Sequence, residues 1–327
     1  MRYQSTRDVS RSVSGAEAIV RGLANDGGLY VPDAIPRLTA AELLKLIQLG
    51  YSDLAFCITK LFLPEFSETE IYDLTKSAYG SQFESGDPAP MVTFGDFSFL
   101  ELWHGPTCAF KDIALQYLPR LLTASLEWVG ETKRVTILVA TSGDTGKAAL
   151  EGFRDVEGTS VTVFYPRDGV SDVQKLQMTT QEGSNVRVCA VDGNFDDVQT
   201  GVKNLFSDVI LRDELDRKGI LLSSANSINW GRLLPQIVYY FHAYASLVRY
   251  GKIKPDDKVN FCVPTGNFGN ILAGYLAREM GLPVNRLICA SNDNNVLADF
   301  FETGVYNRER ELKLTTSPSM DILISSN

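Results

Sequence analysis

The chain has 327 residues, of which 44% are hydrophobic and 22% charged, and its formal net charge is −9. This length and composition predict a globular protein of about two domains with a large buried core. The negative charge argues against a surface for nucleic acid or for an anionic membrane, so we expect neither partner.

The sequence shows neither a targeting segment nor a pattern of metal ligands. The first residues have no apolar signal-peptide core, and no apolar run reaches the length of a membrane span. The five cysteines are scattered without a CxxC pair, which is typical of reduced thiols in a cytoplasmic protein. With two histidines in the chain, we expect no metal site.

Residues 1–95 predict an N-terminal, mostly helical domain. Thr39 is a suitable N-cap for a helix that carries Leu43, Leu44 and Ile47, and Ser67 with Glu70 has the spacing of a capping box. Two further helices are expected at 16–24 and 52–61, and a loop at 86–90.

Residues 96–327 predict an α/β domain, because apolar strand-like runs alternate there with helical stretches. This pattern is typical of an open, mainly parallel sheet with flanking helices. The expected strands are 97–103, 135–140, 161–165, 186–191, 259–263 and 287–290, and the expected helices are 147–153, 171–180, 195–210, 232–250 and 271–280.

The most informative segment is His104-Gly-Pro-Thr-Cys-Ala-Phe-Lys111-Asp112, which follows the run 97–103. A lysine at the end of a strand lies where α/β folds bind ligands. If its amine is partly desolvated, it loses its proton more easily and can form a Schiff base with an aldehyde. A solvated surface lysine beside Asp112 is the alternative at this point.

Two glycine-containing loops each follow a predicted strand and open a predicted helix. Backbone amides at such helix starts bind carboxylates or phosphates, although a plain polar turn fits either loop as well. The first loop is not a nucleotide-binding P-loop, because Gly143 precedes Gly146 by three residues where that motif needs five, and Ala148 replaces its hydroxyl. The two loops are 141–146 and 264–270.

A third polar segment, 223–232, precedes an apolar helix and ends in Arg232. The arginine offers a planar fork for phosphate, and the neighbouring hydroxyls and amides could complete an anion site. A capping loop with a solvated arginine is the alternative. Together, a Schiff-base lysine, two anion-binding loops and this segment point to pyridoxal phosphate, with one loop for its phosphate and another for an amino-acid carboxylate.

The chain resembles the threonine synthase family, pyridoxal-phosphate enzymes of the tryptophan-synthase-β-like fold (fold type II). The likeness runs through most of the chain and keeps its motifs in one order. They are Tyr3-Gln-Ser-Thr, Gly27-Gly-Leu-Tyr-Val-Pro32, the Lys111 segment, Ala140-Thr-Ser-Gly-Asp-Thr-Gly146, Asp192-Gly-Asn-Phe-Asp-Asp197, Asn226-Ser-Ile-Asn-Trp-Gly-Arg232, Thr265-Gly-Asn-Phe-Gly-Asn270 and Ser317-Pro-Ser-Met-Asp-Ile322.

The resemblance implies site roles residue by residue. Lys111 would hold the cofactor through a Schiff base and move protons, and Asp144 would lie near the cofactor's phenolic oxygen. The cofactor phosphate would be bound by Gly266, Asn267, Phe268, Gly269 and Asn270. The substrate carboxylate would be bound by Ser142, Gly143, Asp144 and Thr145, and the substrate phosphate by Asn226, Ser227, Asn229 and Arg232. Lys175 is added for its charge, and Phe110 either walls the site or packs in the core.

The reaction implied by the resemblance converts O-phospho-L-homoserine and water into L-threonine and phosphate, by γ-elimination and β-addition. A mobile subdomain, about 133–222, would close over the substrate. Family members continue beyond residue 327, so the sequence favours a shortened chain with weak or no activity of its own. Whether the protein is a monomer or a homodimer is left open.

Two other functions stay open at this point. A serine or threonine dehydratase would share the lysine and the glycine loops, but it would need no second phosphate site. A non-catalytic relative that binds phospho-amino acids would need no reactive lysine.

Overall fold

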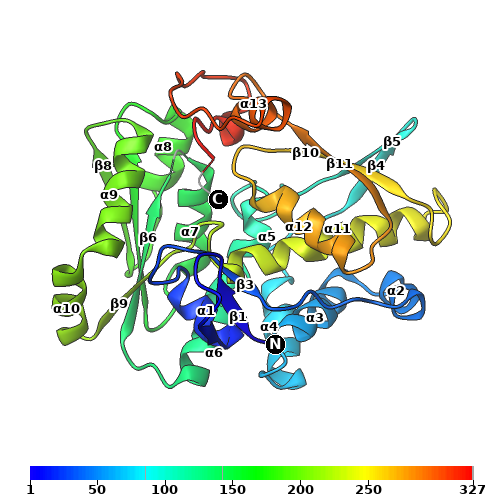
Figure 1. Ribbon diagram of the computed structural model, residues 1–327, viewed down its shortest axis with the longest axis horizontal. Coiled ribbons are helices and arrows are strands. Elements are labelled where there is room, and N and C mark those ends of the chain that lie inside the picture. The colour runs from blue at the N-terminus through cyan, green and yellow to red at the C-terminus, as the bar shows by residue number, and fades with distance from the viewer. Residues whose placement is uncertain (85, 142, 326–327) are drawn as a thin grey trace.

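This computed structural model describes residues 1–84, 86–141 and 143–325 of the chain. Two parallel sheets lie on opposite sides of the molecule, with helices α5 and α7 between them (Figure 1). The expected α/β arrangement of mainly parallel strands with flanking helices is confirmed. No helix in the described ranges is long and apolar enough to cross a bilayer.

The N-terminal residues form four helices and a small antiparallel sheet, which the sequence had not indicated. The expected N-cap at Thr39 and the expected capping box of Ser67 with Glu70 are present, and Thr39 also forms a capping box with Glu42, which was not predicted. The sheet has the order β2-β1-β3. The elements are β1 (Tyr3–Ser5), β2 (Ser12–Val13), β3 (Tyr30–Pro32), α1 (Gly15–Arg21), α2 (Ala40–Ile47), α3 (Tyr51–Phe62) and α4 (Glu68–Ala78).

The first parallel sheet has the order β8-β7-β6-β9. Alternate residues of its central strand β6 face opposite sides of the sheet. Ile137 and Val139 belong to the main core, whereas Leu138 and Ala140 pack with Val198 in a separate, smaller cluster. This unit therefore has some core of its own. Its elements are β6 (Arg134–Ala140), β7 (Thr159–Pro166), β8 (Val186–Val191), β9 (Ile220–Ser223), α7 (Asp144–Phe153), α8 (Asp172–Thr179), α9 (Phe195–Ser207) and α10 (Val209–Arg217).

One helix boundary differs from the expectation. The sequence predicts a single helix at 195–210, but the chain forms α9 and α10 with Asp208 between them. The Asp208 carboxylate accepts a hydrogen bond from the backbone N–H of Leu211, 3.0 Å away, and so starts a new helix.

The second parallel sheet pairs β10 (Val259–Pro264) with β11 (Val284–Ala290). The long helix α11 (Trp230–Arg249) is buried from its first residue to Ser246 and packs against α3, α5 and α12. It therefore forms the centre of the main core. The remaining elements here are α12 (Gly269–Glu279), α13 (Val296–Thr303) and the 3₁₀ turn η1 (Pro318–Met320).

The expected strand 97–103 is shorter and lies elsewhere than predicted. β5 (Phe97–Leu100) pairs only with β4 (Met91–Phe94) in an antiparallel hairpin that projects from the molecule (Figure 1). Lys111 is eleven residues beyond β5 and opens α5 (Lys111–Leu115), so the expectation that it ends a strand is wrong. The apolar run 97–103 resembled a buried strand, but Phe97 and Phe99 of β5 are exposed, as is Phe94 of β4.

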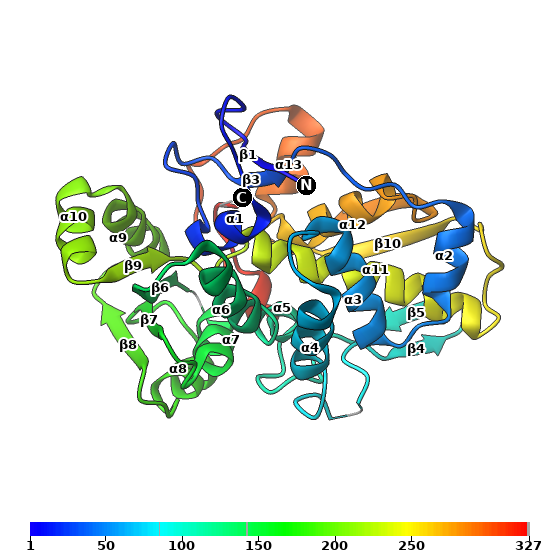
Figure 2. The ribbon, with the colours of Figure 1, turned by 90° about the horizontal axis from the view of Figure 1, so that it is seen from below.

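Helices α5 and α7 touch backbone to backbone. A Cβ atom at Gly152 of α7 would lie 2.1 Å from the carbonyl oxygen of Leu115 in α5. Real side chains do not approach a carbonyl so closely, so only glycine permits this crossing. The helix α6 (Leu118–Val129) follows α5 and contacts both, on the face seen from below (Figure 2).

We predict that Gly152→Ala lowers the free energy of unfolding by about 1–3 kcal/mol, because the added methyl forces the two helices apart. Gly201→Ala is the matched control: Gly201 lies in α9 and its Cβ would meet no atom within 4 Å. That variant should gain about 0.5–1 kcal/mol, since alanine favours a helix interior. Urea unfolding of both variants measures the difference, and equal values would contradict the contact.

Candidate active site

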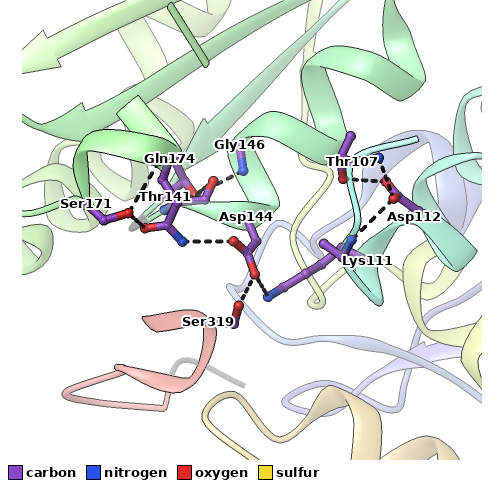
Figure 3. Close-up of polar contacts among 11 residues, drawn as sticks. Thr107, Lys111, Asp112, Thr141, Asp144, Gly146, Ser171, Gln174 and Ser319 are labelled. Atoms are coloured by element: carbon purple, nitrogen blue, oxygen red, sulfur yellow. Dashed lines mark hydrogen bonds and ion pairs between the residues drawn. The ribbon is translucent and has the colours of Figure 1, made fainter. Parts of the chain in front are cut away.

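Lys111 is the first residue of α5, and its side chain points into the space between the two parallel sheets (Figure 3). The residue is 7% exposed. Its Nζ lies 3.2 Å from Oδ2 of Asp144, the first residue of α7, and 4.5 Å from the centre of the Phe110 ring. The solvated-lysine alternative is thereby excluded, and Phe110 lies beside the amine as a wall.

Burial and ion pairing shift the pKa values of both Lys111 and Asp144. Burial lowers the pKa of Lys111 below its ordinary value, and the carboxylate of Asp144 reverses only part of that shift. Burial alone would raise the pKa of Asp144, but the charge of Lys111 and hydrogen bonds from Ser319 and Gln174 lower it instead. The pair thus combines an amine that releases its proton readily with a carboxylate that stays ionised.

Asp112 fixes the turn that leads into Lys111. Its carboxylate accepts hydrogen bonds from the backbone N–H of Thr107 at 2.8 Å and from the Thr107 hydroxyl at 2.7 Å. A Cβ atom at Gly105 would lie 2.5 Å from Cβ of Asp112, so the turn can close on the carboxylate only with glycine there. Burial raises the pKa of Asp112, which is consistent with a structural role away from solvent.

The loop before α7 presents two unused backbone amides. The Thr141 hydroxyl accepts hydrogen bonds from the N–H groups of Gly143 and Gly146, at 2.9 and 3.0 Å. The amides of Gly143 and Gly146 are thus held inside the loop. By contrast, no hydrogen bond from the backbone amides of Asp144 or Thr145 is found within the described ranges. Gly143 has a φ of 152°, and its Cβ would collide with Gln174. Ser142 lies outside the described residues.

Two residues that the sequence analysis missed complete the surroundings of Asp144. Gln174 of α8 donates from Nε2 to Oδ1 of Asp144 at 2.8 Å, and the Ser319 hydroxyl donates to Oδ2 (Figure 3). Lys175, predicted instead for its charge, does not line the cavity. Neither residue carried a local signal of this contact, because Gln174 and Ser319 lie 30 and 175 residues from Asp144 along the chain.

The start of α12 forms the opposite wall. Gly266, Asn267, Gly269 and Asn270 line the cavity, while Phe268 packs against the ring of Phe301. The Asn270 side chain accepts hydrogen bonds from Tyr239 and Tyr240, at 2.6 and 2.8 Å. The first amides of α12 have no acceptor within the helix, which leaves them available to an anion.

Arg232, the third residue of α11, is 3% exposed and lines the same cavity. A hydrogen bond joins its Nη1 to the carbonyl oxygen of Ala225 at 3.1 Å, whereas Nε has no hydrogen-bond partner among the described residues. No ion pair joins Arg232 to a carboxylate in the part of the chain that the structure describes. Burial lowers its pKa to about 10. Such a charge is expensive to bury unless an anion completes its surroundings.

The neighbours of Arg232 divide into two roles. Asn226 and Ser227 line the cavity, and Oδ1 of Asn226 is buried with no hydrogen-bond partner in the part of the chain that the structure describes. Asn229 differs from its predicted role: its amide donates to the carbonyl oxygens of Ile19 and Ser224 and accepts from Gly231 N–H. It caps α11, and both of its side-chain N–H donors are used within the fold, so we assign it to structure rather than to binding of a phosphate.

The cavity shared by these residues has a volume of about 70 Å³. It is narrowed by the segment around η1, since Ile322 lies 2.7 Å from where a Cβ of Gly266 would be. Within the described residues, no group of three or more metal-binding side chains is found.

Two family models match the chain. Residues 2–79 match "Threonine synthase N terminus", and residues 95–326 match "Pyridoxal-phosphate dependent enzyme". Together they cover the N-terminal helices, both parallel sheets and the cavity between them.

Individual relatives agree with these models. The threonine synthases of Saccharomyces cerevisiae and Pseudomonas aeruginosa are 42% and 45% identical over 99% and 100% of this chain. The crystal structure of pyridoxal-phosphate-bound threonine synthase from Brucella melitensis superposes with a TM-score of 0.88, at 43% identity, over 100% of this chain and 68% of that one. The chain spans 64% and 67% of the yeast and Pseudomonas proteins, about two thirds of their length.

We predict that Asp144→Asn moves the titration of Lys111 to lower pH, because the substitution removes the negative charge that raises the pKa of the amine. The measurement is the pH dependence of labelling at Lys111 by a trace acylating reagent, followed by mass spectrometry. Ser319→Ala keeps the carboxylate and serves as the control, with a much smaller shift. A midpoint for Asp144→Asn at or above that of the unmodified chain would contradict the prediction.

Proposed function

We propose that this chain, which belongs to the threonine synthase family of pyridoxal-phosphate-dependent enzymes with the tryptophan-synthase-β-like fold, carries the site that converts O-phospho-L-homoserine and water into L-threonine and phosphate. One observation carries the proposal. The buried amine of Lys111 shares a single cavity with the starts of α7 and α12 and with Arg232, for which the described residues supply no carboxylate partner.

The residues present fit pyridoxal phosphate. Lys111 would hold the cofactor through Nζ, and the start of α12 at Gly266, Asn267, Gly269 and Asn270 would bind its phosphate. The Phe268 side chain packs against Phe301 and does not line the cavity, so it would support this loop rather than contact the phosphate. When bound, the cofactor supplies an electron sink that stabilises negative charge developing on the substrate.

The substrate carboxylate would lie at the start of α7. The amides of Asp144 and Thr145 are available there, and the positive end of the helix favours an anion. Gly143 allows the loop to approach Gln174 closely, and Gln174 in turn orients the Asp144 carboxylate.

Arg232 is the residue that favours a phosphorylated substrate over serine or threonine. Its guanidinium, with Asn226 and Ser227, supplies donors for a second anion beside those at the start of α12. A dehydratase acting on a substrate without phosphate would leave this buried charge uncompensated, at a cost of several kcal/mol.

Lys111 would also move the protons of the reaction. An amine whose pKa is lowered by burial can act as a general base near neutral pH once it is freed from its covalent bond. Asp144 is placed to hold that amine, and its three hydrogen-bonding neighbours keep the carboxylate ionised and fixed.

The unit built on the first parallel sheet would open and close the site. A cavity of about 70 Å³ is too small for a cofactor with its substrate, since ligand pockets usually exceed about 300 Å³. We propose that the unit of about 133–222, which has its own small core, rotates away to admit them. The cytoplasm, where reduced thiols persist, remains the proposed location; all five cysteines are free in the structure.

The proposal is tested by adding pyridoxal phosphate to the purified 327-residue chain and recording the visible absorbance before and after borohydride. We expect an imine band that borohydride removes, with the label mapped by mass spectrometry to the peptide containing Lys111. Lys111→Ala should abolish the band. Label distributed over surface lysines, at equal yield in the variant, would refute the assignment.

A second prediction concerns the substrate phosphate. In the cofactor-loaded chain, Arg232→Met should weaken binding of O-phospho-L-homoserine by about 100-fold, because a buried ionic contact is lost. Binding of L-serine, which lacks the phosphate, should be almost unchanged. Spectral titration with both compounds measures the two affinities. Equal losses for the two compounds would show that Arg232 serves the fold rather than the phosphate.

A further inference from the structure

A second cleft lies on the side of α5 and α7 away from Lys111. Its volume is about 740 Å³, larger than that of the active-site cavity. Its walls come from α4, the turn before α5, the end of α5, α6 and the end of α7, which neighbour one another on the face seen from below (Figure 2). None of its lining residues also lines the active-site cavity.

Two donors in this cleft lack the partners that such groups normally have. Gln116, the C-cap of α5, is 5% exposed, and no described residue hydrogen-bonds to its Nε2. Arg120 donates from Nη1 to the carbonyl oxygen of Gln116 at 2.5 Å, and no ion pair joins it to a carboxylate in the ranges described. A buried amide without a partner costs about 1–3 kcal/mol. A carboxylate from outside the chain would satisfy both groups.

The cleft also carries negative charge and apolar surface. Glu127 lies seven residues after Arg120 on α6, hence on the same side of the helix, and no ion pair to it is found among described residues. The other acid, Glu151, is already paired with Lys147 and Arg154. Leu74 and Ala124 add apolar wall between these charges. The opposite charges of Arg120 and Glu127 match a zwitterion better than a simple anion.

We propose that this cleft binds a free α-amino acid with an apolar side chain. Its carboxylate lies against Gln116 and Arg120, its ammonium group against Glu127, and its side chain against Leu74 and Ala124. This site is separate from the proposed catalytic site and needs neither cofactor nor substrate there.

Occupancy of the cleft bears directly on the Lys111–Asp144 pair. Gln116 is the C-cap of the helix that Lys111 begins, and Gly152 lies in the last turn of the helix that Asp144 begins. The two helices touch beside the cleft, where Gly152 meets Leu115. An amino acid that binds one arrangement of α5 and α7 more tightly shifts the population toward it.

Isothermal titration of the full chain with L-leucine tests the proposal. We expect saturable binding, weakened about tenfold by Arg120→Met and by Glu127→Gln, since each removes one charge contact. Glu127 is exposed, so its variant keeps the fold even if Arg120→Met does not. Arg37→Met, at an exposed arginine outside the cleft, is the matched control and should bind like the unmodified chain.

Ligand variants separate the two charges. L-leucinamide lacks the carboxylate and N-acetyl-L-leucine lacks the ammonium group, and each should bind about tenfold more weakly than L-leucine. Arg232→Met should leave L-leucine binding unchanged, which distinguishes this cleft from the active site. The proposal is overturned if L-leucine shows no saturable binding, or if Arg120→Met and Glu127→Gln both bind it as tightly as the control.

Discussion

The contact between the Lys111 amine and the Asp144 carboxylate is the interaction on which the site depends. It joins the first residue of α5 to the first residue of α7, and so links the main core to the unit built on the first parallel sheet. Burial makes both charges costly, and each is tolerated because the other lies 3.2 Å away. The same burial leaves the amine with a lowered pKa, which is the property that its chemistry requires.

The remaining walls of the cavity are built mainly from the first residues of helices. Among the helices that begin at the cavity, α7 and α12 direct their first amides toward it, and α11 contributes the Arg232 guanidinium. An amino acid that carries a phosphate, together with a cofactor that carries another, presents three anionic groups. The number of positive helix starts and charged donors in the cavity thus matches the charges that the proposed reaction brings in.

The sequence predicted the local features of this fold well. The N-cap at Thr39, the capping box at Ser67 and strand β8 were placed correctly, because a cap or an apolar run is encoded within a few neighbouring residues. The motifs around Lys111, Asp144 and Arg232 were likewise found, and the structure brings them into one cavity. Roles within that cavity remain proposals except where geometry assigns a residue such as Asn229 to structure.

What the sequence could not predict depends on contacts between distant segments. Gln174 and Ser319 reach Asp144 across 30 and 175 residues, and nothing in their own neighbourhood marks them as partners of a carboxylate. The strand before Lys111 was misplaced for the same reason. An apolar run has the same pattern whether it lies inside a parallel sheet or in a projecting hairpin, and only its neighbours in space decide.

The crossing of α5 and α7 sets how the site can move. Because Gly152 meets the backbone of Leu115, the two helices share a fixed contact at one end and the Lys111–Asp144 pair at the other. Rotation of α7 about the glycine contact would separate Asp144 from Lys111, and it would also shift Ala148 and Leu150 of α7, which belong to the main core. In the opening that we propose, a hinge at this crossing would break the pair that tunes the amine, so access to the site and the protonation of Lys111 would be coupled.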